Sequence, residues 1–382
     1  MGPGGRRLPP PLPTGGRLTR SGPLDVVLVA DQLRRPVPGG IGTYIRGLVA
    51  GLHEAGPEAV DVTLWTGRAP SGVDPVAELG RVVASPLPGT VRTRLWDVGI
   101  GRPPGGAEVV HATSLAVPPA RPAPMTVMVH DLAWRHEPDA YPRRGRAWHE
   151  AALGRARKRA AVLLAPSTAT ADDLAAAGVP EDRVVVVEEG CDHLAPPDDD
   201  GAAKLLAHMG VPAGGGYLLT VSTLEPRKNL PGLLDAYARA RARLPEPWPL
   251  VVVGPAGWGP ALPPRPDVHL AGAVDAGVLT ALYAGARLVA YVPRREGWGL
   301  PAVEAMACGT PVVATPMPST GGAACEVPPG DVDAIAEALV AVATDEALRS
   351  RLVAAGRQRA AGLTWAAAAN RHLDVWRKLA AG

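Results

Sequence analysis

The sequence of 382 residues contains no phenylalanine, and its aromatic residues are nine tryptophans and six tyrosines. Every position where a ligand needs an aromatic wall must therefore use Trp, Tyr or His. Gly (45 residues) and Pro (43 residues) are abundant, and 35 of the 39 basic residues are Arg. Ala, Gly, Pro and Arg share GC-rich codons and Phe does not, so codon usage accounts for this bias.

Cysteine is scarce, with Cys191, Cys308 and Cys325 widely spaced and no Cys-x-x-Cys pair. This excludes a disulfide framework and a zinc ribbon, and it fits a reducing compartment. The formal net charge of +2 disfavours a nucleic-acid binder, so no nucleic-acid partner is expected.

Long apolar runs are also missing. The longest uncharged stretch, 305–325, is broken by three prolines and three glycines, which excludes a membrane-spanning helix. Residues 1–23 are rich in Gly, Pro and Arg and have no apolar core, so we expect a disordered tail rather than a signal peptide. The expected location is cytoplasmic, with at most peripheral attachment to the inner face of a membrane.

Short apolar runs alternate with helical patterns in two successive series, which predicts an α/β protein with two doubly wound domains, whose parallel sheets face each other across a cleft. The domain boundaries follow from the change in composition after residue 195. We expect an N-terminal domain over 24–195, a linker region over 196–215 with one short helix near 204–208, and a C-terminal domain over 216–364. Expected strands are 24–30, 60–65, 108–112, 125–130, 162–165, 183–188, 217–222, 250–253, 268–270, 288–292 and 311–314. Expected helices are 41–54, 141–161, 168–177, 230–243, 276–284, 300–308, 332–343, 346–360 and 366–380.

A glycine-rich loop is predicted between the first strand and the first helix, containing Gly40, Ile41 and Gly42. Such a loop allows close approach of a ligand, and the helix N-terminus that follows offers N–H groups to an anion. A plain tight turn is the alternative. The segment fails the dinucleotide-binding fingerprint because Ile45 occupies the position of the third glycine, and this argues against a two-domain oxidoreductase.

Two further segments follow predicted strands. His130 and Asp131 end the strand that begins at Met125, where ligands of open α/β sheets bind. A structural, internally bonded histidine is the alternative. Arg227 and Lys228 lie in a turn after the strand 217–222, where two cations can hold a diphosphate or form a solvated turn. Asn229 is a candidate N-cap of the next helix.

The sharpest pattern is Glu296-Gly297-Trp298-Gly299-Leu300-Pro301, followed by Glu304. The glycines permit a tight turn, and Pro301 suits the first position of a helix. Backbone N–H groups near Gly299 and Leu300 can bind phosphate there. Glu296 and Glu304, which we place in the loop and in the first helical turn, can accept hydrogen bonds from hydroxyl groups of one ligand.

Two groups of aspartates carry no metal site in this interpretation. Asp331 is expected to cap a helix, and the run 198–200 is expected to be solvated in the linker. No His or Cys cluster has metal-ligand spacing. The basic helix over 143–159, which holds Arg155, Arg157, Lys158 and Arg159, could contact an anionic membrane surface or be an ordinary solvated helix.

Taken in order, these segments resemble the GT-B retaining glycosyltransferases known as "glycosyl transferases group 1". The resemblance covers about 24–380 and is strongest over 283–315 (YAGARLVAYVPRREGWGLPAVEAMACGTPVVAT). Within the family, TVSTLEPRKNL at 220–230 is most similar to mannosyltransferases of O-antigen and exopolysaccharide assembly. The resemblance implies that the final helix, 365–382, crosses back to complete the N-terminal domain.

The resemblance also implies roles for individual residues. Gly40, Ile41 and Gly42 would lie near the donor phosphates and the acceptor, and His130 would contact the transferred sugar. Arg227 and Lys228 would bind the diphosphate and stabilise the charge of the leaving group. Six further positions lie in the donor loop and the helix after it. Glu296 would hold sugar hydroxyls and Glu304 the ribose. Backbone N–H groups of Gly297, Trp298, Gly299 and Leu300 would bind the phosphates.

Several positions depart from the family pattern. Ser222-Thr223 stands where many relatives have Gly-Arg, which removes one phosphate-binding arginine. Trp298 replaces a usual Phe, and a Pro-Glu-Val step is missing after Pro318. These departures keep open an alternative, a non-catalytic nucleotide-sugar binder or an inactive partner subunit.

The sequence thus predicts a hexosyltransferase, most similar to mannosyltransferases, that uses a GDP- or UDP-sugar as substrate and needs no metal or cofactor. The acceptor is a glycan, a lipid-linked molecule or a small molecule. Its site is expected in the loops over 70–104 and 135–146.

Overall fold

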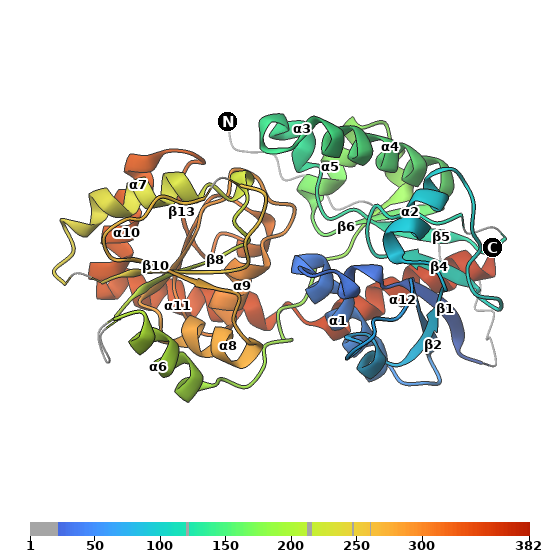
Figure 1. The fold of residues 1–382 in the computed structure, drawn as a ribbon, viewed down its shortest axis with the longest axis horizontal. Coiled ribbons are helices and arrows are strands. Elements are labelled where there is room, and N and C mark those ends of the chain that lie inside the picture. Colours follow the sequence, from blue (N-terminus) through green and yellow to red (C-terminus); the bar gives the residue numbers. More distant parts are fainter. Residues whose placement is uncertain (1–21, 120–121, 212–215, 247, 260) are drawn as a thin grey trace, which may run out of the picture.

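The computed structural model describes residues 22–382 apart from 120–121, 212–215, 247 and 260. They form two Rossmann-like α/β domains, each built on a parallel sheet with helices on both faces (Figure 1). The predicted tail lies outside the described residues except for residues 22 and 23.

The first sheet has the strand order β3-β2-β1-β4-β5-β6-β7. Its strands are β1 (Leu24–Val29), β2 (Val60–Thr66), β3 (Arg81–Ala84), β4 (Val109–Ala112), β5 (Met125–Met128), β6 (Val162–Ala165) and β7 (Val184–Val186). One face is covered by α1 (Gly39–Glu54) and α12 (Trp365–Ala381). The other is covered by α2 (Gly89–Asp97), α4 (Arg143–Arg159) and α5 (Thr168–Ala176), and the short α3 (Ala133–His136) follows β5.

The second sheet has the order β10-β9-β8-β11-β12-β13. Its strands are β8 (Leu218–Val221), β9 (Leu250–Val253), β10 (Val268–Gly272), β11 (Leu288–Tyr291), β12 (Val312–Ala314) and β13 (Cys325–Glu326). Its helices are α6 (Asp199–His208), α7 (Leu230–Arg241), α8 (Ala276–Gly285), α9 (Leu300–Ala307), α10 (Val332–Thr344) and α11 (Glu346–Ala361). The inner strands are covered on both faces of the sheet and are therefore near-continuous runs of Val and Leu.

Four elements, β3, β13, α2 and α3, were missed by the sequence analysis, and α3 spans only four residues. The edge strands β3 and β13 are short, and α2 carries too few apolar residues to show a helical period. The linker helix is α6, longer than the expected 204–208, because Asp198 caps it by accepting from the Gly201 N–H (2.9 Å). That aspartate is therefore a helix cap, and Asp331 caps α10 in the same way, as predicted.

Helix α12 packs along α1, although the two lie more than 300 residues apart in the chain (Figure 1). Trp365 starts α12 and is 3% exposed. A Cβ on Gly47 would lie 2.0 Å from its indole ring, and one on Gly190 would lie 2.4 Å from its backbone nitrogen. The indole fits there only because these two positions lack a side chain.

A chain of buried side chains also joins α12 to the first sheet. The hydrogen-bond partners show which ring nitrogens carry a proton. His372 Nδ1 must donate, because its partner is the Ala368 carbonyl oxygen (2.7 Å). Because burial lowers its pKa, the ring is neutral at neutral pH, so its Nε2 accepts from the Tyr44 hydroxyl (2.8 Å), and the Tyr44 oxygen accepts from His111 Nε2 (2.9 Å). His111 Nδ1 in turn accepts from Thr126 (2.8 Å). Both imidazoles are thus neutral, and burial lowers the pKa of His372 to about 4.

We predict that Gly47→Ala destabilises the protein by about 1–3 kcal/mol, because the methyl group must push α12 away from α1. Gly154→Ala is the matched control, since a Cβ at this helical glycine meets nothing within 4 Å. It should be neutral or stabilise by up to about 1 kcal/mol. Urea unfolding measures both changes, and equal stability of the two variants would contradict the packing argument.

We also predict that acid weakens the fold through His372. Its pKa is lower in the folded state than in the unfolded chain, so the unfolded chain binds the proton more tightly. The stabilisation is complete above about pH 6.5 and is lost as pH falls toward 4, a change of about 3 kcal/mol for this group. His372→Gln should be less stable at pH 7.5 yet lose less stability than wild type on acidification. Urea midpoints at pH 7.5 and pH 5 measure this, and parallel losses would refute it.

Candidate active site

The predicted site residues follow the strands at which the order of each sheet reverses. In the first sheet this point lies between β1 and β4, and in the second between β8 and β11. Ligands of open α/β sheets bind there, beyond the carboxyl ends of the strands. Arg227 follows β8, Glu296 follows β11, and the first turn of α1 follows β1, so the topology brings these segments to the cleft.

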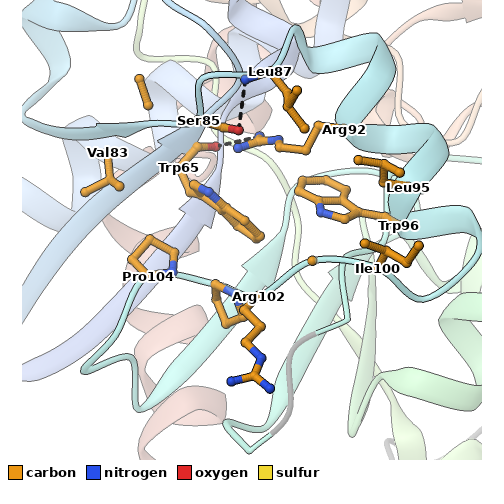
Figure 2. Close-up of a pocket in the computed structure, with 13 residues that line it drawn as sticks. Trp65, Val83, Ser85, Leu87, Arg92, Leu95, Trp96, Ile100, Arg102 and Pro104 are labelled. Carbon is orange, nitrogen blue, oxygen red and sulfur yellow. Dashed lines mark hydrogen bonds between the residues drawn. The ribbon is translucent and has the colours of Figure 1, made fainter.

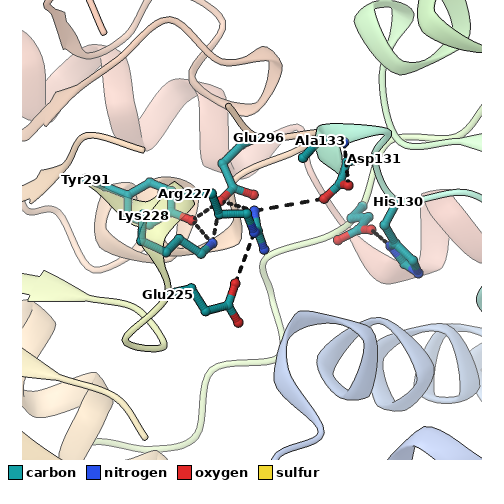
Figure 3. A network of polar contacts seen from close by, with 9 residues as sticks. His130, Asp131, Ala133, Glu225, Arg227, Lys228, Tyr291 and Glu296 are labelled. Carbon is teal, nitrogen blue, oxygen red and sulfur yellow. Dashed lines mark hydrogen bonds and ion pairs between the residues drawn. The ribbon is translucent and has the colours of Figure 1, made fainter. Parts of the chain in front are cut away.

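The centre of the site is the carboxylate of Glu296 (Figure 3). Its Oε1 accepts from Arg227 Nη1 (2.8 Å), from the Lys228 ammonium and from the Tyr291 hydroxyl (2.9 Å). Its Oε2 has no hydrogen-bond donor among the described residues. Glu225 accepts from Arg227 Nε (3.0 Å), so one carboxylate holds each end of that guanidinium.

The charges of this cluster are strongly coupled. Burial raises the pKa of Glu296, but the adjacent Arg227 and Lys228 lower it more, to a value of about 2. Burial and the neighbouring guanidinium lower the pKa of Lys228. Burial raises the pKa of Glu225. Because Glu296 stays ionised well below neutral pH, it can hold both cations in place while its second oxygen accepts from a ligand.

His130 lies across the cleft, held by two acceptors. Nε2 contacts the Thr113 carbonyl oxygen (3.0 Å), and Nδ1 contacts Glu189 Oε1 (3.1 Å). A carbonyl and a carboxylate only accept, so both nitrogens donate and the ring is an imidazolium. Burial lowers the pKa of His130, but Glu189, the Thr113 carbonyl and Asp131 together raise it more, and the net shift is upward. The Tyr44 ring meets the imidazole edge-on, with the ring centroids 5.0 Å apart.

The loop from Glu296 to Gly299 touches the first domain through backbone atoms. The Ser167 hydroxyl donates to the Gly297 carbonyl (2.8 Å). A Cβ on Gly297 would lie 1.8 Å from the His130 carbonyl oxygen, so only glycine permits this approach. Arg227 Nη1 also lies 3.9 Å from Asp131, and Figure 3 shows both domains contributing to one polar network.

Helix α9 begins directly after this loop. Gly299 has a φ of 107°, in the left-handed region that favours glycine, and Pro301 lies in the first turn. Among the described residues, the backbone N–H groups of Gly299 and Leu300 have no acceptor. They remain available to an anion at the helix N-terminus.

Glu304 lies in the second turn of α9 rather than the first, because the helix begins at Leu300. One of its oxygens contacts His193 Nε2 (3.1 Å), and the other accepts from the Tyr283 hydroxyl (2.8 Å). No hydrogen bond joins it to the cluster around Glu296. The two carboxylates therefore belong to separate networks.

The glycine-rich segment differs from its prediction. Gly40, Ile41 and Gly42 form the first turn of α1 and not a loop, since the helix begins at Gly39. A Cβ on Gly40 would lie 3.8 Å from the Leu300 side chain, which places this turn opposite the start of α9.

One other prediction at the site, the Asn229 cap, needs correction. Asn229 makes no side-chain cap; its φ is 56°, and its amide donates to the Val292 carbonyl (3.2 Å), which ties this turn to the end of β11. The Trp298 side chain is 4% exposed, so only its backbone can face a ligand. Its buried indole N–H has no partner within the described part of the chain, and the Arg359 guanidinium lies 5.8 Å from the ring centroid.

Some participants were given no role in the sequence analysis. Asp131 and Glu225 adjoin predicted residues, so their motifs carried a signal. Glu189, His193 and Tyr291 contact the site only through the tertiary structure, and no spacing in the sequence identifies them.

The N-terminal domain has a cavity of about 370 Å³ in the region expected to hold an acceptor (Figure 2). Trp65 and Trp96 line it, and the Arg92 guanidinium lies 4.6 and 4.5 Å from their ring centroids. Arg102 and Ile100 also line this space. It offers both an aromatic wall and a cation.

The basic helix α4 is largely bound to its own chain. Arg155 pairs with Asp97 (2.6 Å), and Arg157 donates to the Gly178 carbonyl (3.0 Å). Arg159 donates to two carbonyls at 2.8 and 2.9 Å. Of the four cations considered for a membrane surface, only Lys158 has no such partner among the described residues.

No helix within the described ranges is long and apolar enough to cross a membrane. Across the same ranges, no three His, Cys, Asp or Glu side chains converge in a way that could hold a metal ion.

Comparison with known proteins identifies both halves of the chain. The profile "Glycosyl transferases group 1" matches residues 215–345, and "Glycosyltransferase Family 4" matches 38–193. The O-antigen chain mannosyltransferase B of Escherichia coli is 28% identical over 263 residues, covering 65% of this chain and 69% of the relative. D-inositol 3-phosphate glycosyltransferase 1 of Catenulispora acidiphila is 30% identical over 391 residues, covering 90% and 92%. The chain spans about half of some other relatives, such as 52% of the enzyme from Kineococcus radiotolerans.

Solved structures share the fold. HepE of Anabaena, crystallised with UDP and glucose, superimposes with a TM-score of 0.70 at 16% identity, covering 93% of this chain and 100% of HepE. Sucrose-phosphate synthase of Thermosynechococcus elongatus gives 0.67 at 20% identity, covering 94% and 99%. The two-domain GT-B fold is confirmed, and the chain belongs to the glycosyl transferases group 1 family.

Proposed function

We propose that this protein transfers a hexose, with mannose as the favoured candidate, from a GDP- or UDP-sugar to an acceptor with retention of anomeric configuration. The arrangement around Glu296 carries the proposal. One carboxylate oxygen fixes Arg227 and Lys228 at the cleft, and the other has no donor from the described residues. Similarity to the mannosyltransferase of Escherichia coli supports the choice of sugar.

The chemistry follows from these positions. The bond between the sugar C1 and the phosphate oxygen breaks, and its electron pair leaves with the nucleoside diphosphate. Arg227, Lys228 and the N–H groups at the start of α9 stabilise that developing charge, which is where most of the barrier reduction in such a step arises. The acceptor hydroxyl attacks on the same face, and its proton passes to the departing phosphate. No side chain is assigned as a nucleophile.

The remaining groups orient the substrates. Glu296 Oε2 accepts from sugar hydroxyls, Glu304 binds the ribose, and His130 faces the sugar from the other domain. No metal takes part in this proposal, because the cation pair and the helix N-terminus supply the positive charge. The acceptor, a glycan, a lipid-linked molecule or a small molecule, enters from the N-terminal domain, where the Trp65–Trp96 cavity lies.

We predict that Lys228→Ala and Glu296→Ala each lower kcat/KM by about 10²–10³-fold, through loss of transition-state stabilisation. Lys204→Ala, which removes an exposed lysine of α6, is the control and should retain full activity. Mass spectrometry of donor hydrolysis across a panel of nucleotide sugars, with and without EDTA, measures the effect. Wild-type rates in both variants would refute the site, and binding without any turnover would favour the non-catalytic alternative.

We also predict that His130 titrates above the ordinary histidine value in the wild-type protein and at lower pH in Glu189→Gln. The neutral amide no longer stabilises the imidazolium, so its proton is lost more easily. In wild type, the stabilisation from this pair is present at low pH and is lost as pH rises through the folded pKa. NMR titration of the imidazole resonances measures both values. An unchanged pKa in Glu189→Gln would show that this carboxylate does not control the charge.

A further inference from the structure

His193 lies where the chain first passes from the N-terminal to the C-terminal domain, and it joins three parts of the fold. Its Nδ1 accepts from the Trp365 indole N–H (3.1 Å), at the start of the returning helix α12. Its Nε2 contacts Glu304 Oε1 (3.1 Å) in the donor domain. The His193 side chain is 21% exposed and that of Glu304 is 10% exposed, so both are largely shielded from water.

The protonation state of His193 follows from its partners. An indole N–H can only donate, so Nδ1 must carry the lone pair. The ring proton therefore lies on Nε2 and is donated to the Glu304 carboxylate. Trp365 thus selects the tautomer that lets a neutral His193 hold Glu304.

The surroundings hold this geometry rigidly. Asp192 accepts from the Trp365 backbone N–H (2.8 Å), and the Cys191 N–H donates to the Leu363 carbonyl (3.0 Å). The two segments that connect the domains therefore lie side by side at His193. The Trp365 ring cannot shift easily, because Gly47 and Gly190 leave no free space around it.

Both carboxylate oxygens of Glu304 can accept further hydrogen bonds. Each of its oxygens receives one donor from the protein, His193 on one side and Tyr283 on the other. Each oxygen keeps a lone pair that can accept from a hydroxyl group. Two such oxygens with fixed orientation suit the vicinal 2′- and 3′-hydroxyls of a ribose.

We propose that His193 is a positioning residue that orients Glu304 toward the ribose hydroxyls of the donor and so sets the preference for a ribonucleotide. This inference rests on the proposed function, which places the donor ribose at Glu304. The preference for a ribonucleotide would then also depend on Trp365, the first residue of helix α12, which returns to the N-terminal domain.

The test compares the affinities of GDP and UDP with those of their 2′,3′-dideoxy forms by calorimetry. The ratio of ribo to dideoxy affinity isolates the hydroxyl contacts, and a merely structural role would not change it. In His193→Ala we expect this ratio to fall about 5- to 10-fold, while affinity for the dideoxy nucleotide stays unchanged. His208→Ala, which removes an exposed histidine of α6, is the control and should keep the wild-type ratio.

Two further variants keep the test informative if His193→Ala folds poorly. His193→Gln can still present an N–H to Glu304 and should restore most of the ratio. Trp365→Phe removes the donor that selects the tautomer and should lower the ratio by a smaller factor. In a Glu304→Gln background, His193→Ala should cause no additional loss, since the two residues act as a unit.

The outcomes separate the two proposals. A wild-type ratio in both His193→Ala and Trp365→Phe, with nucleotide binding intact, overturns the role of His193 and leaves the proposed function standing. Failure of the wild-type protein to bind either GDP or UDP overturns the proposed function, and the role of His193 with it.

Discussion

The position of Trp365 is the constraint on which much of this structure depends. Its indole occupies a space left by two glycines of other segments, and its ring N–H and backbone N–H bind His193 and Asp192. One residue therefore docks the returning helix on the first domain and fixes the junction between the two domains. Through His193 it also reaches a carboxylate of the donor domain. A packing requirement and a functional hydrogen bond thus meet in the same side chain.

The buried charges at the cleft are paired with opposite charges. Arg227 and Lys228 are adjacent in sequence and would repel each other without compensation. Glu296 contacts both cations through a single oxygen, and Glu225 accepts from the other side of the guanidinium, so that two carboxylates balance two cations. On the opposite wall, Glu189 keeps His130 charged. Such paired charges are costly to bury unless they are hydrogen-bonded, and here the Tyr291 hydroxyl and the Thr113 carbonyl add to the ion pairs, while Glu296 Oε2 stays without a donor among the described residues.

The contrast between His130 and the core histidines shows how environment sets charge. His372 and His111 are buried with only neutral partners, and burial lowers the pKa of each. His130 lies near two carboxylates and a carbonyl oxygen, which together outweigh its burial. Tyr44 contacts all three rings, so one tyrosine of α1 links the neutral core network to the charged histidine at the cleft.

The sequence alone determined the fold class and the position of the turn before α9. Continuous Val and Leu runs are typical of a buried parallel sheet, and Gly-Trp-Gly-Leu-Pro favours a tight turn that starts a helix. Short edge strands such as β13 could not be predicted from the sequence, because two residues are too few to show an apolar pattern. Only the tertiary structure decided which charges pair, which histidine is protonated and which tautomer His193 adopts. These depend on contacts such as that of His193 with Glu304, 111 residues apart, and that of Tyr44 with His372, 328 residues apart. Spacing along the chain carries no information about such pairs until the sheets and the returning helix bring them together.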